Sequence, residues 1–455
     1  MATVKRMKRS VPKGLTVGVE VEFFVLDKLG RVAPGADAIL KKIDEKAGGK
    51  PHNVVKECAK NLIEVGSYPD PEGHNAMLSL IEGLKTLLYA ANECGYTICP
   101  LATYPGTFTP ALREDANYKV QLKLFGRNRF QVAGRCAGFH CHHTLPRGVF
   151  DAKELRLKSL RDSKHQESLV HAYNLLVALD PAFTTFTQSS PFYQGRHLAK
   201  DSRMLVYRGG EDLGYIKGLY TNYSSHGALP SYVHSGTDLI HHIEARHENW
   251  KGELRRAGIP ERRFPSYRSI LDTNWSPVKV NAHGTLEQRG MDMNHLPILL
   301  SIAVLMRGLL KHVEDGSVKV VPHDSAKNEP FKLAKDTVHI PPEAHVKKHL
   351  QKLSAYEGLA NDEVYVYCKR LVHLVKTLEG DSIGWLLKPI ETMLEERKTT
   401  ADKIIAEASA LGHKDLKKPL PQKIAAEIAL SHSKKVFEDI VLMQEMIEKN
   451  TRLSL

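Results

Sequence analysis

Residues 15–27 read LTVGVEVEFFVLD, and this stretch has the clearest strand pattern in the chain. Valine and phenylalanine favour strands, and the DKLG sequence at its end is typical of a turn. Because side chains alternate between the two faces of a strand, Glu20 and Glu22 share one face and the neighbouring valines share the other. The pattern predicts a strand with an apolar face and two adjacent carboxylates opposite to it, although a solvated strand surface would read the same way.

A second pair of acidic residues, Glu57 and Glu64, occurs in the sequence KECAKNLIEVG. A short strand around residues 61–65 would bury Ile63 and Val65 and turn the Glu64 carboxylate to the opposite side. A strand at the protein surface explains this pattern equally well.

Three histidines follow a glycine and a phenylalanine in GFHCHH, residues 138–143. In a strand, His140 and His142 share one face, and Cys141 and His143 share the other. Histidine is a common metal ligand, but it is also common as a hydrogen-bonded core or surface group. The spacing alone does not decide between these two interpretations.

The sequence GTLEQRG, residues 284–290, places Glu287 and Arg289 on one face of another short strand. The planar fork of arginine suits a phosphate or a carboxylate, and a neighbouring glutamate can hold a metal ion or the arginine itself. A simple cross-strand salt bridge is the alternative.

Helices are predicted where apolar residues recur at three- and four-residue spacing, near residues 76–93 and 152–179. The apolar run 296–306 is too short to span a membrane and predicts a buried helix. Residues 364–378 and 423–449 read as amphipathic helices. Helices and strands are mixed without the regular alternation of a parallel α/β sheet.

The composition of the chain changes beyond residue 330, where amphipathic helices dominate. The stretch 322–345 contains VPHDSAKNEP and HIPPEAH, which interrupt regular elements. We therefore predict two domains, a mixed one over residues 1–330 and a helical C-terminal module over residues 331–455.

The 455 residues, of which 42% are hydrophobic and 25% charged, are typical of a soluble globular protein. The net charge of +12 favours an anionic partner, such as a nucleotide or a small acid. Basic residues are not interleaved with aromatic ones, so no specific nucleic-acid partner is expected. MATVKRMKRSVPKG at the N-terminus lacks the apolar stretch of a secretory signal, so we expect a cytoplasmic protein with no membrane partner. Six cysteines without a C-x-x-C pair indicate reduced thiols and exclude a zinc ribbon.

Several well-known motifs are missing from the chain. The near miss KAGGKP is no P-loop, because Asp44 stands where the first glycine belongs, and no G-x-G-x-x-G follows a strand. Residues 241–250, HHIEARHENW, lack the spacing H-E-x-x-H and predict an exposed helix.

Five motifs taken in chain order, GVEVEFF, ECAKNLIEV, GFHCHH, SSPFYQGR and GTLEQRG, resemble the carboxylate-amine ligase family typified by glutamate-cysteine ligase and related to glutamine synthetase. The resemblance covers roughly residues 15–300. It implies an α+β fold in which a curved antiparallel sheet forms a funnel-shaped active site with helices outside. On this view residues 1–330 are the catalytic domain, and the helical module after them is unexplained by the motifs.

The resemblance also implies roles for individual residues. Glu287 and Arg289 would be catalytic, Glu22, His142 and Arg289 would face the nucleotide, and a loop at residues 190–192 would lie beside the substrate. The implied metal ligands are Glu20, Glu22, Glu57, Glu64, His140 and Glu287, and the implied substrate-binding residues are Gln194, Arg196 and Arg203.

The chemistry implied by the resemblance is the use of ATP to form an acyl phosphate, which an amine then attacks. Mg²⁺, with Mn²⁺ as an alternative, prefers the oxygen ligands that these glutamates offer. Glutamate and cysteine are the leading pair of small-molecule substrates, which would give γ-glutamylcysteine for glutathione biosynthesis. Lys279 stands where the family usually has an arginine, which leaves substrate choice open.

Three alternatives remain at this stage: a ligase for a different acid and amine, a phosphotransferase acting on a guanidino compound, and a non-catalytic nucleotide-binding protein. A homo-oligomer is compatible with the sequence but is not indicated by any motif.

Overall fold

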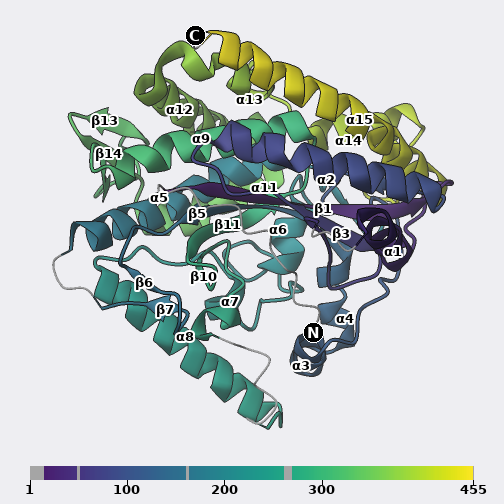
Figure 1. Ribbon diagram of the computed structural model, residues 1–455, viewed down its shortest axis with the longest axis horizontal. Helices are drawn as coiled ribbons and strands as arrows, with labels where there is room; N and C mark the ends of the chain where they lie inside the picture. Colours follow the sequence, from purple (N-terminus) through teal and green to yellow (C-terminus); the bar gives the residue numbers. More distant parts are fainter. Residues whose placement is uncertain (1–14, 49–51, 160–162, 261–268, 454–455) are drawn as a thin grey trace.

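A seven-stranded antiparallel sheet lies at the centre of the computed structural model (Figure 1). The strand order is β10-β11-β5-β1-β3-β2, and β4 also pairs with β1. The strands are β1 (Val17–Asp27), β2 (Val54–Lys56), β3 (Leu62–Gly66), β4 (Tyr96–Cys99), β5 (Gly138–Thr144), β10 (Val278–Asn281) and β11 (Thr285–Asp292). The structure describes residues 15–48, 52–159, 163–260 and 269–453. The basic N-terminal segment considered above therefore lies outside the described residues.

The register of the sheet aligns the motifs of the sequence with one another. On β1, Glu20 lies opposite His140 of β5, and Glu22 lies opposite Glu64 of β3. On the next strand along the sheet, Glu287 of β11 lies opposite His142 of β5. Segments that are far apart in the sequence thus meet on one face of the sheet.

The opposite face of the sheet is apolar and is covered by helices. Val17, Val19, Val21 and Phe23 of β1 are fully buried. The helices α2 (Gly73–Glu93) and α9 (Leu296–Glu314) pack on this side, and Figure 1 shows further helices beyond them. These outer helices are α12 (Asp362–Glu379), α13 (Gly384–Glu396) and α15 (Gln422–Leu453).

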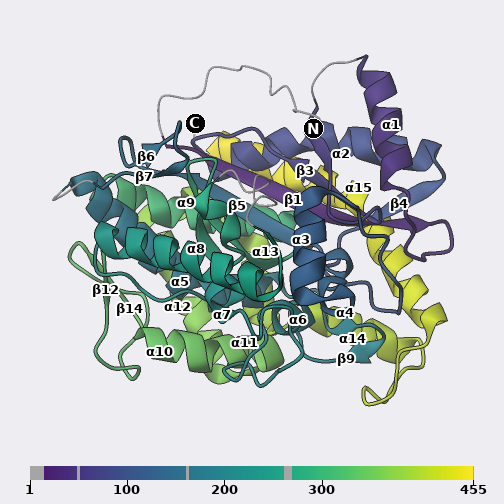
Figure 2. The same ribbon diagram turned by 90° about the horizontal axis from the view of Figure 1, so that it is seen from below.

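The remaining elements surround the sheet (Figure 2). The long helix α5 (Lys164–Thr187) packs against both α9 and β11. The other helices are α1 (Ala36–Ala47), α3 (Ala116–Phe125), α4 (Arg127–Phe130), α6 (Ser202–Tyr207), α7 (Ser224–Gly227), α8 (Gly236–Arg256), α10 (Glu343–His345), α11 (Gln351–Glu357) and α14 (Thr400–Ala410). The short 3-10 segments are η1 (Ala133–Arg135), η3 (Ile270–Thr273), η5 (Gly358–Ala360) and η6 (Gly380–Ile383), and η4 (Val346–Leu350) is a π-helical turn. The minor strands are β6 (Phe150–Asp151), β7 (Arg156–Leu157), β8 (Phe192–Tyr193), β9 (Arg196–His197), β12 (Lys319–Pro322), β13 (Lys332–Ala334) and β14 (Thr337–Ile340).

Most of the predicted elements are confirmed. The four predicted strands correspond to β1, β3, β5 and β11, and the helices predicted near 76–93, 241–250, 364–378 and 423–449 correspond to α2, α8, α12 and α15. The mixed α+β class with an antiparallel sheet and a helical C-terminal region is also confirmed.

The helix predicted over residues 152–179 is wrong in its first part. Residues 150–157 form the small hairpin β6–β7, and α5 begins only at Lys164. Leu157 is buried within that hairpin, and Leu155 adopts a left-handed backbone conformation with φ of 50°. The leucine spacing resembles that of a helix, but a positive φ is incompatible with a helical backbone.

The predicted boundary at residue 330 falls inside a three-stranded sheet. β12 precedes it, whereas β13 and β14 follow it and pair with one another and with β12. The stretch 322–345 is therefore less irregular than expected, and the hydrophobic core continues from the central sheet into α12, α13 and α15. The division into two domains stays a prediction.

A chain of buried polar contacts connects the C-terminal helix to α9. His295, just before α9, binds Asp439 of α15 through Nδ1 at 2.6 Å and His432 of α15 through Nε2 at 2.8 Å. The other ring nitrogen of His432 lies 3.2 Å from a carboxylate oxygen of Glu407 on α14. These contacts join three helices that are distant in the sequence.

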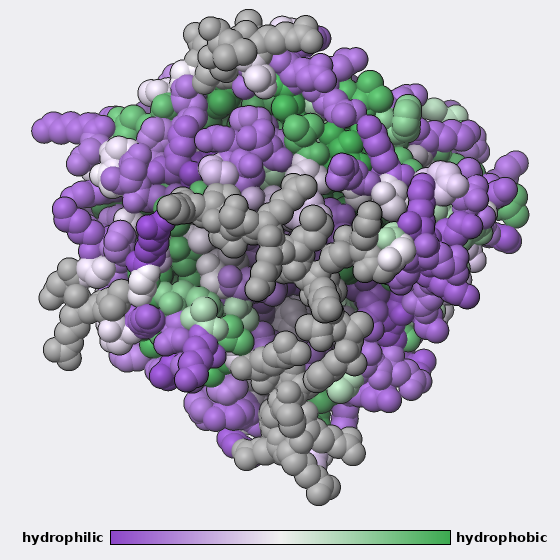
Figure 3. All heavy atoms as spheres, in the orientation of Figure 1, coloured by the Kyte–Doolittle hydropathy of each residue, from purple (hydrophilic) through white to green (hydrophobic). Residues whose placement is uncertain are grey.

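One helix, α9, is long and apolar enough to cross a membrane, but 89% of its most apolar window is buried inside the fold. This agrees with the buried helix that the sequence predicts. Hydrophilic side chains predominate on the face of the molecule drawn in Figure 3.

Candidate functional site

The polar face of the sheet brings five of the predicted metal ligands together. Oxygen or nitrogen atoms of Glu20, Glu64 and His140 all lie within 4.8 Å of one another. A second group, formed by Glu22, Glu57 and Glu64, meets the same criterion. Because Glu64 belongs to both groups, the two sets of side chains form two adjoining candidate cation sites. Three or four carboxylates so close together repel one another unless cations lie between them.

Of the two histidines on this face of β5, His140 lies between the carboxylates of β1 and His142 lies beside Glu20. His140 is 3.4 Å from Glu20 through Nδ1 and 3.6 Å from Glu22 through Nε2. His142 is 3.3 Å from Glu20 through Nε2 and 3.0 Å from the hydroxyl of Thr285 through Nδ1. In contrast, His143 lies on the apolar side, where it binds Glu314 of α9. The strand alternation predicted from GFHCHH is thus confirmed.

The carboxylates of this face differ in their affinity for protons. Burial raises the pKa of Glu64 well above its usual range, and the charges of Glu20 and Glu57 raise it further. Burial and the charge of Glu57 also raise the pKa of Glu22. Backbone groups hold Glu57 and Glu22 in place, since the amide of Cys58 donates to Glu57 at 3.0 Å and the amide of Gly138 donates to Glu22 at 2.6 Å. Buried carboxylates with raised pKa values and oxygen atoms turned toward one another are a suitable donor set for Mg²⁺ or Mn²⁺.

The histidines have the opposite effect on Glu20. Burial would raise the pKa of this carboxyl, but His142 and His140 outweigh burial and hold it well below its usual range. Burial would likewise lower the pKa of His142, yet Glu20 and Glu287 raise it. The polar face of the sheet therefore carries a cluster of carboxylates, and within this cluster Glu20 and His142 form an ion pair.

Glu287 lies outside the two groups of possible metal ligands among the described residues. One of its oxygens accepts from Arg289 at 2.9 Å, and the other lies 3.6 Å from Lys279 and accepts from Asn281. Burial opposes ionisation of Glu287, but the charges of Lys279 and Arg289 lower its pKa. Direct metal binding by Glu287 stays a prediction, because its contacts here are all with cationic or amide groups.

Lys279 holds Glu287 in place and also donates to the carbonyl of Asn274 at 3.0 Å. Burial lowers its pKa, although Glu287 opposes this effect. The residue that departs from the usual family pattern is therefore part of the Glu287 ion-pair network.

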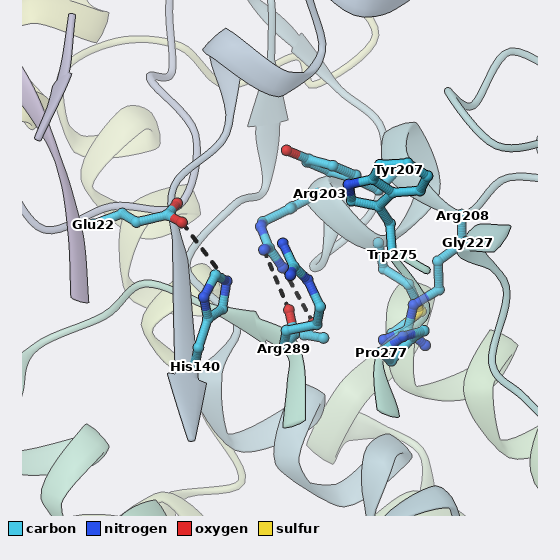
Figure 4. A pocket seen from close by; sticks show the side chains of 11 residues that line it. Glu22, His140, Arg203, Tyr207, Arg208, Gly227, Trp275, Pro277 and Arg289 are labelled. Atoms are coloured by element: carbon cyan, nitrogen blue, oxygen red, sulfur yellow. Dashed lines mark hydrogen bonds and ion pairs between the residues drawn. The ribbon is translucent and has the colours of Figure 1, made fainter. Parts of the chain in front are cut away.

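A cavity opens beside the acidic face (Figure 4). Glu22 and His140 lie on one side of it, and Arg203 and Arg289 lie opposite. The remaining lining residues are Met204, Tyr207, Arg208, Gly227, Trp275, Pro277 and Gly290. A carboxylate and an imidazole on one wall and guanidinium groups on the other can hold a cation and an anion side by side, as a phosphate bound with its metal ion requires.

Arg203, one of the predicted substrate-binding residues, lines this cavity and is held there by hydrogen bonds. Its guanidinium donates to the carbonyl of Gly290 at 3.2 Å and that of Arg289 at 3.4 Å. Its Nε is buried without a hydrogen-bond partner among the described residues. Burial opposes the charge, but Asp292 raises the pKa of this guanidinium. Arg203 is thus a charged residue of the cavity lining with one donor that has no hydrogen-bond partner among the described residues.

Two glycines are required for the arginines to approach the sheet. A Cβ atom on Gly138 would lie 2.5 Å from Nη2 of Arg203, and one on Gly290 would lie 2.4 Å from Nη2 of Arg208. The glycine of GFHCHH therefore makes room for Arg203, while its amide donates to Glu22 at 2.6 Å.

Arg208, Tyr207 and Trp275 are site residues that the sequence did not single out. Arg208 forms a bidentate ion pair with Asp180 at 2.5 and 2.9 Å, and it also donates to Gln351 at 2.6 Å. A signal was available for Asp180, because a carboxylate inside an otherwise apolar helix needs a buried partner. The sequence alone does not indicate which arginine is the partner of Asp180.

Two other predicted substrate-binding residues lie elsewhere. Gln194 and Arg196 belong to the β8–β9 hairpin, which is held through Gly195 by backbone contacts with Pro105 and Leu420. The structure does not bring them into the cavity that Arg203 lines. Their role in substrate binding stays a prediction.

Comparisons with known proteins identify the family of the chain and similar folds. A family model described as glutamate-cysteine ligase family 2 (GCS2) matches residues 16–339. A search of curated protein sequences gave no match. Among solved structures, the glutamate-cysteine ligase of Francisella tularensis in complex with AMP is similar with a TM-score of 0.56 at 14% identity, over 97% of this chain and 98% of that one.

The bifunctional glutathione synthetase of Pasteurella multocida is also similar, with a TM-score of 0.56 and 14% identity. The match covers 93% of this chain and 53% of that one, so the chain spans about half the length of the bifunctional enzyme. At these identities the two structures establish the fold alone. The family match, in contrast, extends over well more than half of the chain and includes every strand of the central sheet. The chain therefore belongs to glutamate-cysteine ligase family 2, and it is an ATP-dependent carbon-nitrogen ligase.

Proposed function

We propose that this ligase joins the γ-carboxylate of glutamate to the amine of cysteine, through an acyl phosphate made from ATP and Mg²⁺. The observation that carries the proposal is the cavity in which Glu22 and His140 face Arg203 and Arg289. Phosphoryl transfer gathers negative charge on oxygen atoms, and guanidinium groups opposite a carboxylate that we propose to bind metal would suit that charge.

In this proposal the two carboxylate groups hold the metal ions. Glu20, Glu64 and His140 would form one position, and Glu22, Glu57 and Glu64 would form the other. Imidazole is an unusual ligand for Mg²⁺, so in an alternative arrangement His140 would bind phosphate instead of metal. Bound Mg²⁺ would neutralise the phosphates and align the terminal one for attack by the substrate carboxylate.

The guanidinium groups would act on the other side of the cavity. Arg289, which Glu287 holds in position at 2.9 Å, would stabilise the transferred phosphoryl group. Arg203, with its free donor, would bind the carboxylate of the acid substrate. His142 would line the nucleotide side through its contact with Glu20.

The test measures ATP consumption by purified protein with Mg²⁺, using amino acids singly and in pairs. We expect phosphate release only when glutamate and cysteine are both present, and transfer of ¹⁸O from the glutamate carboxylate to phosphate. Glu287→Gln should reduce turnover about 100-fold or more, as for other groups that organise transition-state charge. Glu114→Gln is the matched control, because that side chain is 88% exposed.

Other outcomes would name a different reaction. Turnover with another acid and amine would keep the ligase and change its substrates. Formation of ADP with a stable phosphorylated product and no need for an amine would support a guanidino phosphotransferase. Tight binding of Mg²⁺ and nucleotide without turnover would support a binding protein.

A further inference from the structure

A second group of metal-binding side chains lies away from the central sheet. It consists of His345 at the end of α10, His349 in the π-helical turn η4, and Glu363 in the first turn of α12. Their ligand atoms all lie within 4.8 Å of one another. Figure 2 shows the helices α10 and α11, which flank η4, at the lower edge of the molecule.

The Nε2 atoms of both histidines lie close to the carboxylate of Glu363. Nε2 of His345 lies 2.7 Å from one oxygen of Glu363, and Nε2 of His349 lies 2.8 Å from the other. The two imidazole rings lie side by side, with centroids 4.9 Å apart. The π-helical turn begins directly after His345 and contains His349, and such turns are frequent at functional sites.

The donor set differs in kind from that of the catalytic face. There, carboxylates supply most of the ligand atoms, which suits Mg²⁺. Here, two imidazoles four residues apart and one carboxylate form the set that Zn²⁺ and neighbouring transition metals prefer. We propose that His345, His349 and Glu363 form a binding site for a divalent transition-metal ion, with Zn²⁺ as its probe and water as the remaining ligand.

Only small movements are needed to admit the ion. With bonds of about 2.0–2.1 Å to nitrogen and oxygen, ligand atoms around a tetrahedral Zn²⁺ lie roughly 3.3 Å apart. The observed distances between imidazole nitrogen and carboxylate oxygen must therefore widen by about half an ångström. The side chains of His349 and Glu363 are 51% and 43% exposed, so they are free to move and an ion can enter from solvent.

Each imidazole must present a lone pair at Nε2 to the ion. In the hydrogen-bonded arrangement both Nε2 atoms donate to Glu363, so on binding the proton moves to Nδ1 by exchange with water. No oxidant or reductant is needed, and the net change is the replacement of two hydrogen bonds by three metal-ligand bonds.

The site is connected to the catalytic cavity by a short path. Gln351 follows the π-helical turn directly and accepts from Arg208, which lines that cavity. The side-chain amide of Gln351 donates to the carbonyl of Lys347 inside the turn at 2.9 Å. A metal ion that tightens this turn would therefore also restrain Gln351 and Arg208.

The test titrates metal-stripped protein with Zn²⁺ while excess Mg²⁺ occupies the oxygen-rich face. We compare wild type with the double variant His345→Ala/His349→Ala and with the single variant His349→Ala, whose half-exposed side chain makes misfolding a minor concern. His373→Ala is the matched control, since His373 is an exposed histidine on α12 outside the group. Co²⁺ serves as a second probe, because its visible absorption reports tetrahedral coordination.

We expect wild type and His373→Ala to bind one equivalent of Zn²⁺ that the double variant does not bind. His349→Ala should weaken this binding about 100-fold or more, because loss of a direct ligand should cost at least as much as loss of an outer-shell partner, which costs roughly 10- to 100-fold. At a free Zn²⁺ concentration 100 times the Kd, the ratio of folded to unfolded wild type should rise about 100-fold, and this gain should vanish in the double variant. Equal Zn²⁺ stoichiometry and affinity in wild type and double variant would overturn the proposal, and would leave the three side chains as a surface hydrogen-bonded group.

Discussion

Gly138 is a residue at which the backbone closely approaches a guanidinium group in the candidate site. A methyl group here would lie 2.5 Å from Nη2 of Arg203 and 3.0 Å from Nε2 of His140. We predict that Gly138→Ala displaces the Arg203 guanidinium but keeps the hydrogen bond that the amide of residue 138 donates to Glu22. Losing a charged hydrogen bond of about 1.5–3 kcal/mol should raise the KM for the acid substrate about 10- to 100-fold. Steady-state kinetics with varied acid and saturating ATP measures this change.

Gly66 provides the control for this substitution. It lies on β3 opposite Glu20, and no heavy atom lies within 4 Å of the Cβ that alanine would add. Gly66→Ala should therefore keep the KM of wild type. Equal effects of the two substitutions would show that glycine matters at these positions for the strand and not for Arg203.

At this scale the sequence predicted much of the metal-binding face and less of the cavity. Alternation along a strand determines that Glu20 and Glu22 point the same way, and it separates His142 from His143. No local rule brings Arg208 to Asp180, because their ion pair depends on how α6 and α5 pack. Arg203 was found only through the family resemblance.

At the scale of elements, prediction succeeded where a segment is long and strongly periodic. The apolar alternation of β1 and the helical spacing of α2, α12 and α15 are each sufficient on their own. The two-residue strands of the β6–β7 and β8–β9 hairpins are too short to carry a period. Leu155 shows how far local spacing can mislead, since its positive φ is imposed by the hairpin.

The buried contact between α14 and α15 leads to a prediction about pH. If both rings are neutral and His295 donates from Nδ1 to Asp439, then His432 donates from Nδ1 to Nε2 of His295, and its own Nε2 offers a lone pair to the carboxylate of Glu407 at 3.2 Å. Burial lowers the pKa of His432, although Glu407 opposes this effect, and His295 and Lys435 lower the pKa further. Asp439 faces the other ring of this chain. With both rings neutral, as this prediction assumes for pH 8, two acceptors face each other.

Glu407→Gln would supply the missing donor. We predict that it raises the free energy of unfolding at pH 8 by about 1 kcal/mol, the net contribution of one hydrogen bond. A histidine with a lowered pKa in the folded state favours folding at high pH, and this contribution is lost as the pH falls below about 6.5. Once the pH falls through the lowered folded-state pKa of His432, the wild type regains a charged pair, so the advantage of the variant should shrink toward acidic pH.

Urea unfolding at the two pH values measures this difference. Glu445→Gln, an exposed position on the same helix α15, accounts for the general effect of removing one negative charge. A gain for Glu407→Gln that is the same at pH 5 and pH 8 would contradict the assigned role of His432.

At the scale of the whole molecule, we expect the close carboxylates of the acidic face to serve function but to lower the stability of the metal-free protein. Glu64 is within 4.8 Å of the ligand atoms of both groups, so removing its charge relieves repulsion with every neighbouring carboxylate. We predict that Glu64→Gln raises the free energy of unfolding without Mg²⁺ by about 0.5–2 kcal/mol. The same change should weaken the stabilisation that Mg²⁺ gives, because a shared ligand is lost.

Thermal and urea unfolding with and without Mg²⁺, at matched ionic strength, measures both effects. Glu82→Gln on the exposed side of α2 controls for the change in net charge of this basic protein. A destabilised variant with an unchanged response to Mg²⁺ would show that Glu64 is a structural residue and not a ligand.

The position of β1 at the centre of the sheet also bears on how the chain is made. The apolar face of β1 is covered by α2 and α9. On a nascent chain, part of that face therefore stays exposed until α9 has been completed at residue 314. At roughly 5–20 residues per second, synthesis from residue 27 to residue 314 takes about 15 to 60 seconds on the ribosome. During this interval VGVEVEFFV would be a strongly aggregating segment if it carried no charge. Glu20 and Glu22 interrupt it as gatekeepers, so the carboxylates proposed to hold metal in the finished enzyme also keep the unfinished chain soluble.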